Sequence, residues 1–418
     1  MLKHILRTEW RNLSAERTLW VVAALLALVL GYGLVNGTGW VRFQQNTLAG
    51  AAREEATCLG YRTRAPTEIE QGRVTPPDNP FANPQQPRTV GNTRGTRYAM
   101  LPPGPLAALA IGQSDLTPYY FRVSTLDRQS FAQNDELENP TNLLAGPFDV
   151  AFVIVYLYPL LILALGFNLV SGERDEGTLA LVLSQPVALR TVVLGKVLVR
   201  GGLVVALATA LSLAGALAGG VDFAAEGIWL RLGLWVAVVA LYGAFWLALS
   251  VAVSALGWSS PVNAALLTGL WLFFVVIVPA TVNIVVTTLS PVPSRVELIQ
   301  AMRTASEAAT AQGSRLLSRY YEDHPELLPG GGRYDAQNFA LRSTAAREAV
   351  ERTVAPIRER YDRQLLGQQA LIERYRFASP AIVAHEALVD LAGTGLGRYR
   401  HFLAQVDVFH RRWQNYFV

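Results

Sequence analysis

Five long runs of apolar residues, separated by polar segments of very different length, dominate the pattern of this chain. They cover residues 19–35, 148–170, 197–220, 228–256 and 261–289. A helix needs about 20 residues to cross a hydrocarbon layer of roughly 30 Å, and the runs are close to or above that length. The pattern predicts a polytopic α-helical membrane protein with five membrane-spanning helices.

The first 18 residues have the spacing of an amphipathic helix, with apolar side chains on one face and basic side chains largely on the others. These are Leu2, Ile5, Leu6 and Leu13 on the apolar face, and Lys3, Arg7, Arg11 and Arg17 elsewhere. We expect an interfacial elbow helix over residues 1–18, with its basic side toward lipid headgroups. The alternative is a plain basic flank that only sets the membrane topology.

The segment 171–196 between the second and third runs is unusually structured for a short connection. Gly177 is suited to ending one helix, Thr178 to capping the next, and Pro186 to terminating it. The pattern predicts a small interfacial helix over residues 178–184, lying across the membrane face. A charged cluster precedes this helix and two cations follow it, namely Glu173, Arg174, Asp175, Glu176, Lys196 and Arg200.

Two large polar insertions lie outside the apolar runs. Residues 36–147 begin with an expected helix over 40–59 and continue into a proline-rich tract over 65–105, which favours an irregular, mixed domain with a few short strands and helices. Residues 290–418 contain two long amphipathic patterns, 296–321 and 335–375, and predict a helical hairpin projecting from the membrane. A long helix with both charge signs is usually a solvated face, although a docking surface is the alternative.

Orientation follows from the short segments, because long loops cross a membrane regardless of their charge. The N-terminal tail and the segment 171–200 each carry four basic residues, whereas the short turn after residue 220 carries none. The tail and the segment 171–196 are therefore expected in the cytoplasm, and both insertions outside it. Five spans leave residue 418 outside, so we expect a sixth span after it.

The residues GER, GTL, SQP and GK within 172–196 resemble the loop between the second and third spans of ABC-2-type transporter permeases. The chain also resembles the subgroup of these permeases with a domain of unknown function, DUF3526, which is grouped loosely with permeases of multicopper-enzyme maturation. Further residues carry this resemblance: Leu101-Pro102-Pro103, Gly112, Asp115-Leu116-Thr117-Pro118, Asn139-Pro140, Gly146-Pro147-Phe148-Asp149 and Leu391-Ala392-Gly393-Thr394-Gly395.

The resemblance implies an ABC-2-type transmembrane domain whose coupling helix docks onto a separate ATP-hydrolysing subunit. That subunit would bind ATP and magnesium, so no cofactor is expected in this chain. The other implied partners are a second permease subunit, identical or paralogous, membrane lipid and a periplasmic protein. The expected contact set for the ATPase is Gly172, Glu173, Arg174, Glu176, Gly177, Thr178, Leu179, Ser184 and Pro186.

Residues that would support catalysis by this chain itself are missing from the sequence. Gly195-Lys196 lacks both the earlier glycine and the following Ser or Thr of a phosphate-binding loop, and the five histidines form no HExxH motif. The single cysteine, Cys58, excludes a disulfide framework and a cysteine-clustered metal site. A net charge of +4 gives no case for nucleic-acid binding.

We therefore interpret the chain as the permease subunit of a bacterial ABC-2-type exporter in the inner membrane, with its N-terminus in the cytoplasm. One alternative is a non-transporting mechanotransmitter that uses ATP hydrolysis inside the cell to control a periplasmic partner. An importer is the second alternative. A membrane-bound enzyme is the weakest, because we find no catalytic constellation.

Overall fold

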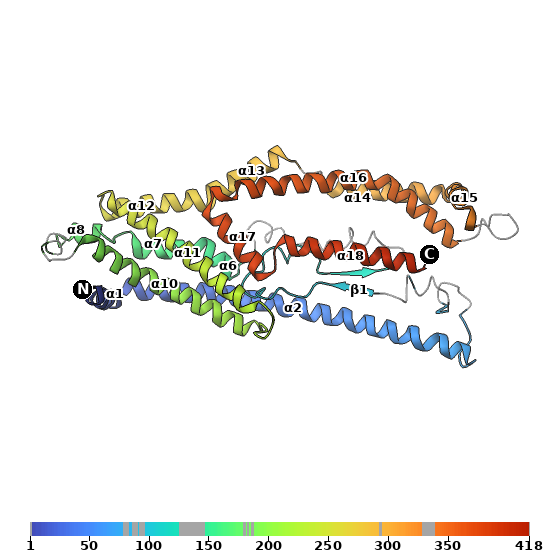
Figure 1. Ribbon diagram of the computed structural model, residues 1–418, viewed down its shortest axis with the longest axis horizontal. Coiled ribbons are helices and arrows are strands. Elements are labelled where there is room, and N and C mark those ends of the chain that lie inside the picture. Colours follow the sequence, from blue (N-terminus) through green and yellow to red (C-terminus); the bar gives the residue numbers. More distant parts are fainter. Residues whose placement is uncertain are drawn as a thin grey trace.

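The molecule is elongated and mainly helical, with the N-terminus at one end of a helical bundle and the polar insertions at the other (Figure 1). The computed structural model describes residues 2–77, 83–85, 91, 97–124, 147–178, 181, 184, 188–291, 295–327 and 339–417. Within these residues, five helices are long and apolar enough to cross a membrane. The predicted fold class, an α-helical polytopic membrane protein, is confirmed.

The five candidate spans follow the five apolar runs closely. The second and fifth each contain a π-helical turn just ahead of a proline, at Pro159 and Pro279. A proline has no N–H and its ring crowds the carbonyl four residues earlier, and the wider turn accommodates both defects. The spans are α2 (Arg17–Glu70), α6, η1, α7 and α8 together (Val150–Asp175), α10 (Leu189–Ala218), α11 (Ile228–Ala255), and α12, η2 and α13 together (Ser260–Leu289).

The first span differs from the prediction because α2 is one continuous helix of 54 residues. At 1.5 Å per residue it is about 81 Å long, far more than a bilayer needs. The predicted helix end at residue 35 is therefore wrong. Residues 40–59 are helical as predicted, but they belong to α2 and are not a separate helix, and the predicted irregular tract starts after Glu70 and not at residue 65. Gly33 and Gly37 sit inside α2 where its backbone meets the backbone of Asp149 and Ala108, so their role is close packing and not helix termination.

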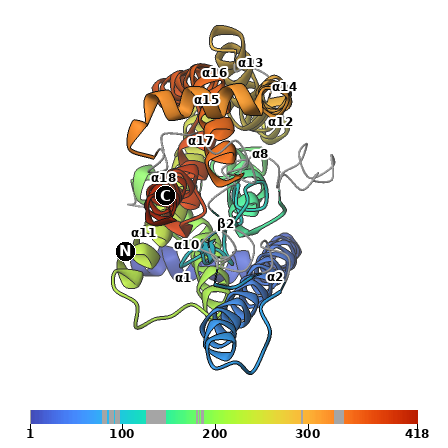
Figure 2. The ribbon, with the colours of Figure 1, turned by 90° about the vertical axis from the view of Figure 1, so that its right-hand side faces the viewer.

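Helix α1 (Leu2–Ala15) crosses the long axis of the molecule beside the ends of the spans, as Figure 2 shows. Its apolar face packs on α10, where a Cβ on Gly195 would lie 2.6 Å from Ile5. Leu13 is fully buried in the main core. The expected helix is present over residues 2–15, and Ile5 and Leu13 of its apolar face pack inside the protein. Its interfacial position stays a prediction.

Two short strands form the centre of the first insertion. Strands β1 (Arg97–Met100) and β2 (Tyr120–Val123) pair antiparallel, and Phe121 stacks on Phe402 of α18 (Leu396–Phe417) with ring centroids 5.9 Å apart. The loop between the strands runs back into the end of the bundle, where six consecutive apolar residues from Leu106 onward are almost completely buried.

The second insertion contains the predicted helical hairpin. Pro356 lies inside α16 without ending it. The helices are α14 (Arg295–Ala311), α15 (Gly313–Asp323) and α16 (Phe339–Tyr375), with the short turns η3 (Pro325–Leu327) and η4 (Arg376–Ala378).

Helix α17 (Pro380–Ala392) was assigned from the sequence to the outer insertion, yet it packs into the core of the bundle. Ser379 Oγ caps its first turn and also donates to the backbone oxygen of Phe274 in η2 at 2.6 Å. Arg231, in the first turn of α11, donates to Leu391 O at 3.1 Å. With 13 residues α17 is too short to span a membrane, which is why the apolar pattern did not reveal it.

Candidate functional site

The short helix α8 (Ser171–Asp175) is at the end of the second span, at the same end of the molecule as α1 (Figure 1). It ends in a Schellman motif, in which Thr178 N donates to Glu173 O at 2.8 Å and Gly177 N donates to Arg174 O at 3.0 Å. Gly177 has a φ of 75°, which glycine adopts without steric cost. The predicted helix end at Gly177 is confirmed, and Thr178 belongs to that same motif.

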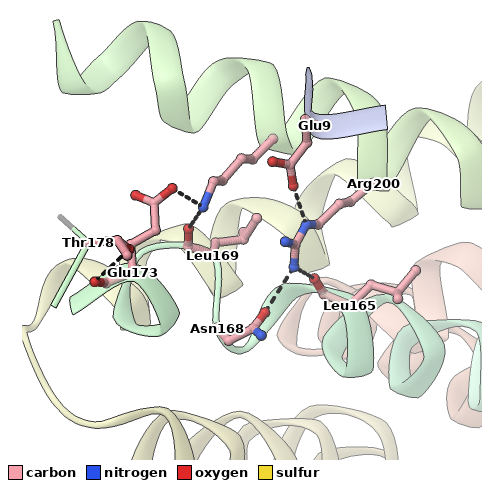
Figure 3. A network of polar contacts seen from close by, with 8 residues as sticks. Glu9, Leu165, Asn168, Leu169, Glu173, Thr178 and Arg200 are labelled. Atoms are coloured by element: carbon pink, nitrogen blue, oxygen red, sulfur yellow. Dashed lines mark hydrogen bonds and ion pairs between the residues drawn. The ribbon is translucent and has the colours of Figure 1, made fainter. Parts of the chain in front are cut away.

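Glu173 of α8 points into the bundle and not away from it. Its Oε1 lies 2.8 Å from Nζ of Lys196, and the side chains are 21% and 8% exposed. Lys196 also donates to Leu169 O at 3.0 Å. A lysine on α10 thereby holds α8 and the end of the second span together (Figure 3).

Arg200, one helical turn further along α10, forms a second buried node. Its Nε donates to Oε1 of Glu9 at 2.9 Å, and its Nη1 donates to Leu165 O and to Asn168 Oδ1, each at 2.9 Å. The Arg200 and Glu9 side chains are only 9% and 10% exposed. Figure 3 shows α1, the second span and α10 converging on this guanidinium.

The remaining charged residues of α8 attach it to the turn between α11 and α12. Asp175 Oδ2 accepts from the backbone N of Ser260 at 3.0 Å and from its hydroxyl at 2.7 Å. The Arg174 guanidinium donates to the backbone oxygen of Trp258. The Ser171 and Ser260 hydroxyls are 2.9 Å apart. A displacement of α8 therefore acts directly on the start of the fifth span.

Buried charges of this kind are strongly coupled. Leaving one member of a buried ion pair without its partner costs about 3–5 kcal/mol, because the remaining charge stays desolvated. In a membrane protein such residues are expensive and tend to mark functional positions. The network thus links α1, α8 and α10 at this end of the bundle.

The residues expected to contact an ATPase fall into three groups in the structure. Glu173 is half-buried in the network, whereas Arg174, Glu176, Gly177 and Ser184 are exposed. Gly172 packs beside Asn168, and Thr178 is partly covered. Leu179 and Pro186 lie outside the described residues, as does most of the helix predicted over 178–184.

Sequence reasoning missed three participants, namely Glu9, Asn168 and Ser260. Glu9 carried a usable signal, since its spacing of four residues from Ile5 and from Leu13 places an acid on the apolar face of α1. An acid there requires a buried cation, and Arg200 is the charge inside the third apolar run. Asn168 and Ser260 carried no signal, because single polar residues near span ends are common.

A second cluster lies at the opposite end of the bundle, where the loop after β1 meets three helices. Asp149 caps the second span by accepting from Phe152 N at 2.7 Å, and its other oxygen accepts from Ile111 N at 2.7 Å. Thr394, just after α17, donates to Ala110 O at 3.0 Å. We call residues 104–112 of this loop the wedge.

The wedge brings together segments that the sequence singled out separately. Residues 101–118, Asp149 and 391–395 meet there, and Leu106 N donates to Ala392 O at 3.2 Å. Asp149 lies directly before the first residue of the second span. Burial raises the pKa of its carboxyl group to about 6, although several backbone N–H groups oppose that shift.

Comparison with known families supports both parts of the resemblance. The family model described as ABC-2 family transporter protein matches residues 125–280, which include α8 and the ion-paired part of α10. The family model described as domain of unknown function DUF3526 matches residues 295–418. No protein with a curated description matches the chain.

Proposed function

We propose that this chain, which matches the ABC-2 family transporter model over residues 125–280 and the DUF3526 model over 295–418, is an ABC-2-type permease. In this role it couples ATP hydrolysis by a separate subunit to movement of its membrane helices. The observation that carries the proposal is the attachment of α8. Glu173 binds α10, whereas Arg174 and Asp175 bind the turn before α12. A force applied to α8 would reach the second, third and fifth spans at once.

The residues around α8 divide into two roles, and Leu181 and Asp175 are added here to the contact set proposed from the sequence. Glu176 is exposed and Leu181 is 70% exposed, so they are placed to touch an ATP-hydrolysing subunit. Glu173 and Asp175 are instead bound inside this chain, so they would transmit the displacement. Closure of two ATPases under a dimer of permeases would push α8, and Arg200 would pass the displacement to α1 through Glu9.

The test separates docking from transmission in the complex with a co-expressed ATPase from a neighbouring reading frame. Glu176→Arg with Leu181→Asp should lower co-purification of the ATPase at least tenfold. Glu173→Gln with Asp175→Asn should leave co-purification intact and lower stimulated ATP hydrolysis. Glu226→Arg, at an exposed acid in the turn before α11, is the matched control and should change neither.

The proposal is wrong if replacing Glu173 and Arg174 together leaves both ATPase co-purification and stimulated hydrolysis unchanged. Export is the proposed direction, and it follows from the family resemblance alone. ATP-dependent movement of a labelled cargo into inverted vesicles would support export, and accumulation in right-side-out vesicles would support import.

A second function, mechanical control of a periplasmic partner without transport, is favoured by the way the outer insertions are attached. Helix α2 continues without a break from the membrane to Glu70, and the wedge ties α2, α10 and α17 to the β-hairpin. Movement of the bundle would therefore reach the outer domain directly. ATP-dependent distance changes between spin labels on α2 and α16, without cargo movement, would favour this function over export.

A further inference from the structure

An apolar groove runs between α10 and α11 near their ends beside α8, with a volume of about 900 Å³. Within the groove the two helices approach each other closely. At the point of contact, a Cβ on Gly201 would lie 2.2 Å from the side chain of Leu247. Small lining residues leave this space open, namely Gly202, Ala240, Ala244, Ala248 and Ala252.

The depth of the groove distinguishes between its possible occupants. It extends along α10 from Leu189 to Val205 and along α11 from Ala240 to Ala252, so it covers one half of each span only. The lining of α11 over residues 240–252 rises about 18 Å, and that of α10 over 189–205 rises about 24 Å. One half of a hydrocarbon core is about 15 Å thick. A second membrane-spanning helix would need a surface along both halves, whereas a lipid chain from one leaflet needs one.

The charge at the mouth of the groove identifies the headgroup. Arg190 lines the groove in the first turn of α10 and is exposed. Among the described residues it has no ion-pair partner, unlike Lys196 and Arg200 on the same helix. A guanidinium at the edge of the hydrocarbon layer is complementary to a phosphate, which it binds with two parallel hydrogen bonds.

We propose that this groove holds an acyl chain of an anionic phospholipid of the cytoplasmic leaflet, with the lipid phosphate at Arg190. The acyl chain would fill the space between α10 and α11, next to the network that contains Lys196 and Arg200. Whether the groove is occupied by lipid would therefore affect how α10 moves when α8 is displaced, so this inference rests on the proposed function. Lipid retention can be measured without the ATPase, so failure of this inference and failure of the proposed coupling are distinguishable.

The experiment compares the full-length protein purified in mild detergent from membranes containing both phosphatidylglycerol and phosphatidylethanolamine. Native mass spectrometry measures the ratio of the two lipids that stay bound. We expect phosphatidylglycerol to be retained preferentially, and Arg190→Gln to lower the ratio about fivefold. Arg190→Lys should keep most of the preference for phosphatidylglycerol. Arg17→Gln, at the start of another span, is the control and should leave the ratio unchanged.

A second variant tests the groove itself. Gly202→Leu puts a side chain into open space within the groove, because nothing lies within 4 Å of its Cβ position. It should expel the lipid without unfolding α10. Gly233→Leu, at an equally open position on the other half of α11, should retain it. The inference is overturned if both leucine variants retain equal lipid, if Arg190→Gln keeps the ratio, or if a photo-crosslinker at Ala248 captures a second copy of the chain instead of lipid.

Discussion

At the scale of single residues, the feature that matters most is where the cations of α10 are. Positive residues near span ends usually face lipid headgroups, but Lys196 and Arg200 are turned inward and are only 6% and 8% exposed. Each cation has a carboxylate and backbone oxygens around it. They therefore organise the protein interior, and Arg190 remains the cation on this helix that is open to lipid.

The Glu9–Arg200 pair predicts a measurable asymmetry in stability. Glu9→Gln removes the charge that balances a buried guanidinium and should lower the free energy of unfolding by about 3–5 kcal/mol. Replacing both partners, Glu9→Leu with Arg200→Met, should recover most of that loss, because no charge is then left buried. Thermal unfolding in detergent gives both values.

The matched control is the exposed pair Arg303–Glu307, whose side chains are 81% and 68% exposed. Arg303→Met should change stability by no more than about 0.5 kcal/mol. If Glu9→Gln has an effect as small as this control, the buried pair does not hold α1 to α10.

Asp149 predicts a pH dependence of stability. Its folded-state pKa of about 6 lies above the ordinary value of 3.8, so the folded protein holds this proton more tightly than the unfolded chain. Its contribution to stability is therefore fully present below about pH 4 and is lost as the pH rises through 6. The loss should be on the order of 1–3 kcal/mol. Unfolding temperatures measured from pH 4.5 to 7.5 should fall with rising pH in the wild type, and this fall should be smaller in Asp149→Asn, which has no proton to lose at this position.

At the scale of elements, close backbone packing explains why α2 stays helical through its glycines. Gly37 has no room for a side chain, because a Cβ there would lie 2.1 Å from the backbone oxygen of Ala108 in the wedge. Gly39, two residues later, has nothing within 4 Å. Glycine lowers helix propensity by about 1 kcal/mol relative to alanine, so α2 accepts this cost at Gly37 in exchange for the contact.

The two glycines therefore predict substitutions of opposite sign in one helix. Gly37→Ala should destabilise the protein by about 1–3 kcal/mol, because the wedge backbone must move away. Gly39→Ala should stabilise it by up to about 1 kcal/mol. Both effects are read from unfolding midpoints in detergent. Equal effects at the two positions would mean that the wedge does not pack on α2.

At the scale of the whole molecule, the bundle has the ion-paired network at one end and the wedge at the other, where it continues into the two insertions (Figure 1). Helices α2 and α16 both extend well beyond the bundle (Figures 1 and 2). Helix α18 packs on the β-hairpin formed by β1 and β2. The two ends are therefore mechanically connected through rigid elements. This arrangement suits a protein that carries motion across a membrane.

The proposed orientation can be tested with the single cysteine of the chain. Cys58 lies on the part of α2 beyond the bundle and is half-buried. A membrane-impermeant maleimide added to spheroplasts should label it without permeabilisation. In Cys58→Ser with Ser184→Cys, labelling should require permeabilised cells. The reverse pattern would place α8 outside the cell and remove the basis for coupling to ATP hydrolysis.

The amino-acid sequence alone determined the five spans, the helix end at Gly177 and the hairpin of the second insertion. Each depends on residues close together in the chain, through apolar run length, local turn chemistry or amphipathic period. Such local signals do not depend on which distant segments pack together in the folded protein. The expected ATPase contacts around α8 stay a prediction, and the sequence did not indicate which of those residues are exposed and which are paired inside the chain.

Only the tertiary structure decided which residues act together. Glu9 meets Arg200 across 191 positions, and Thr394 meets Ala110 across 284. The same is true of α2, where the wedge packs on Gly37, and of α17, whose 13 residues become part of the core only beside α11. Contacts over such separations depend on how whole helices pack, and a single sequence carries no local pattern for that.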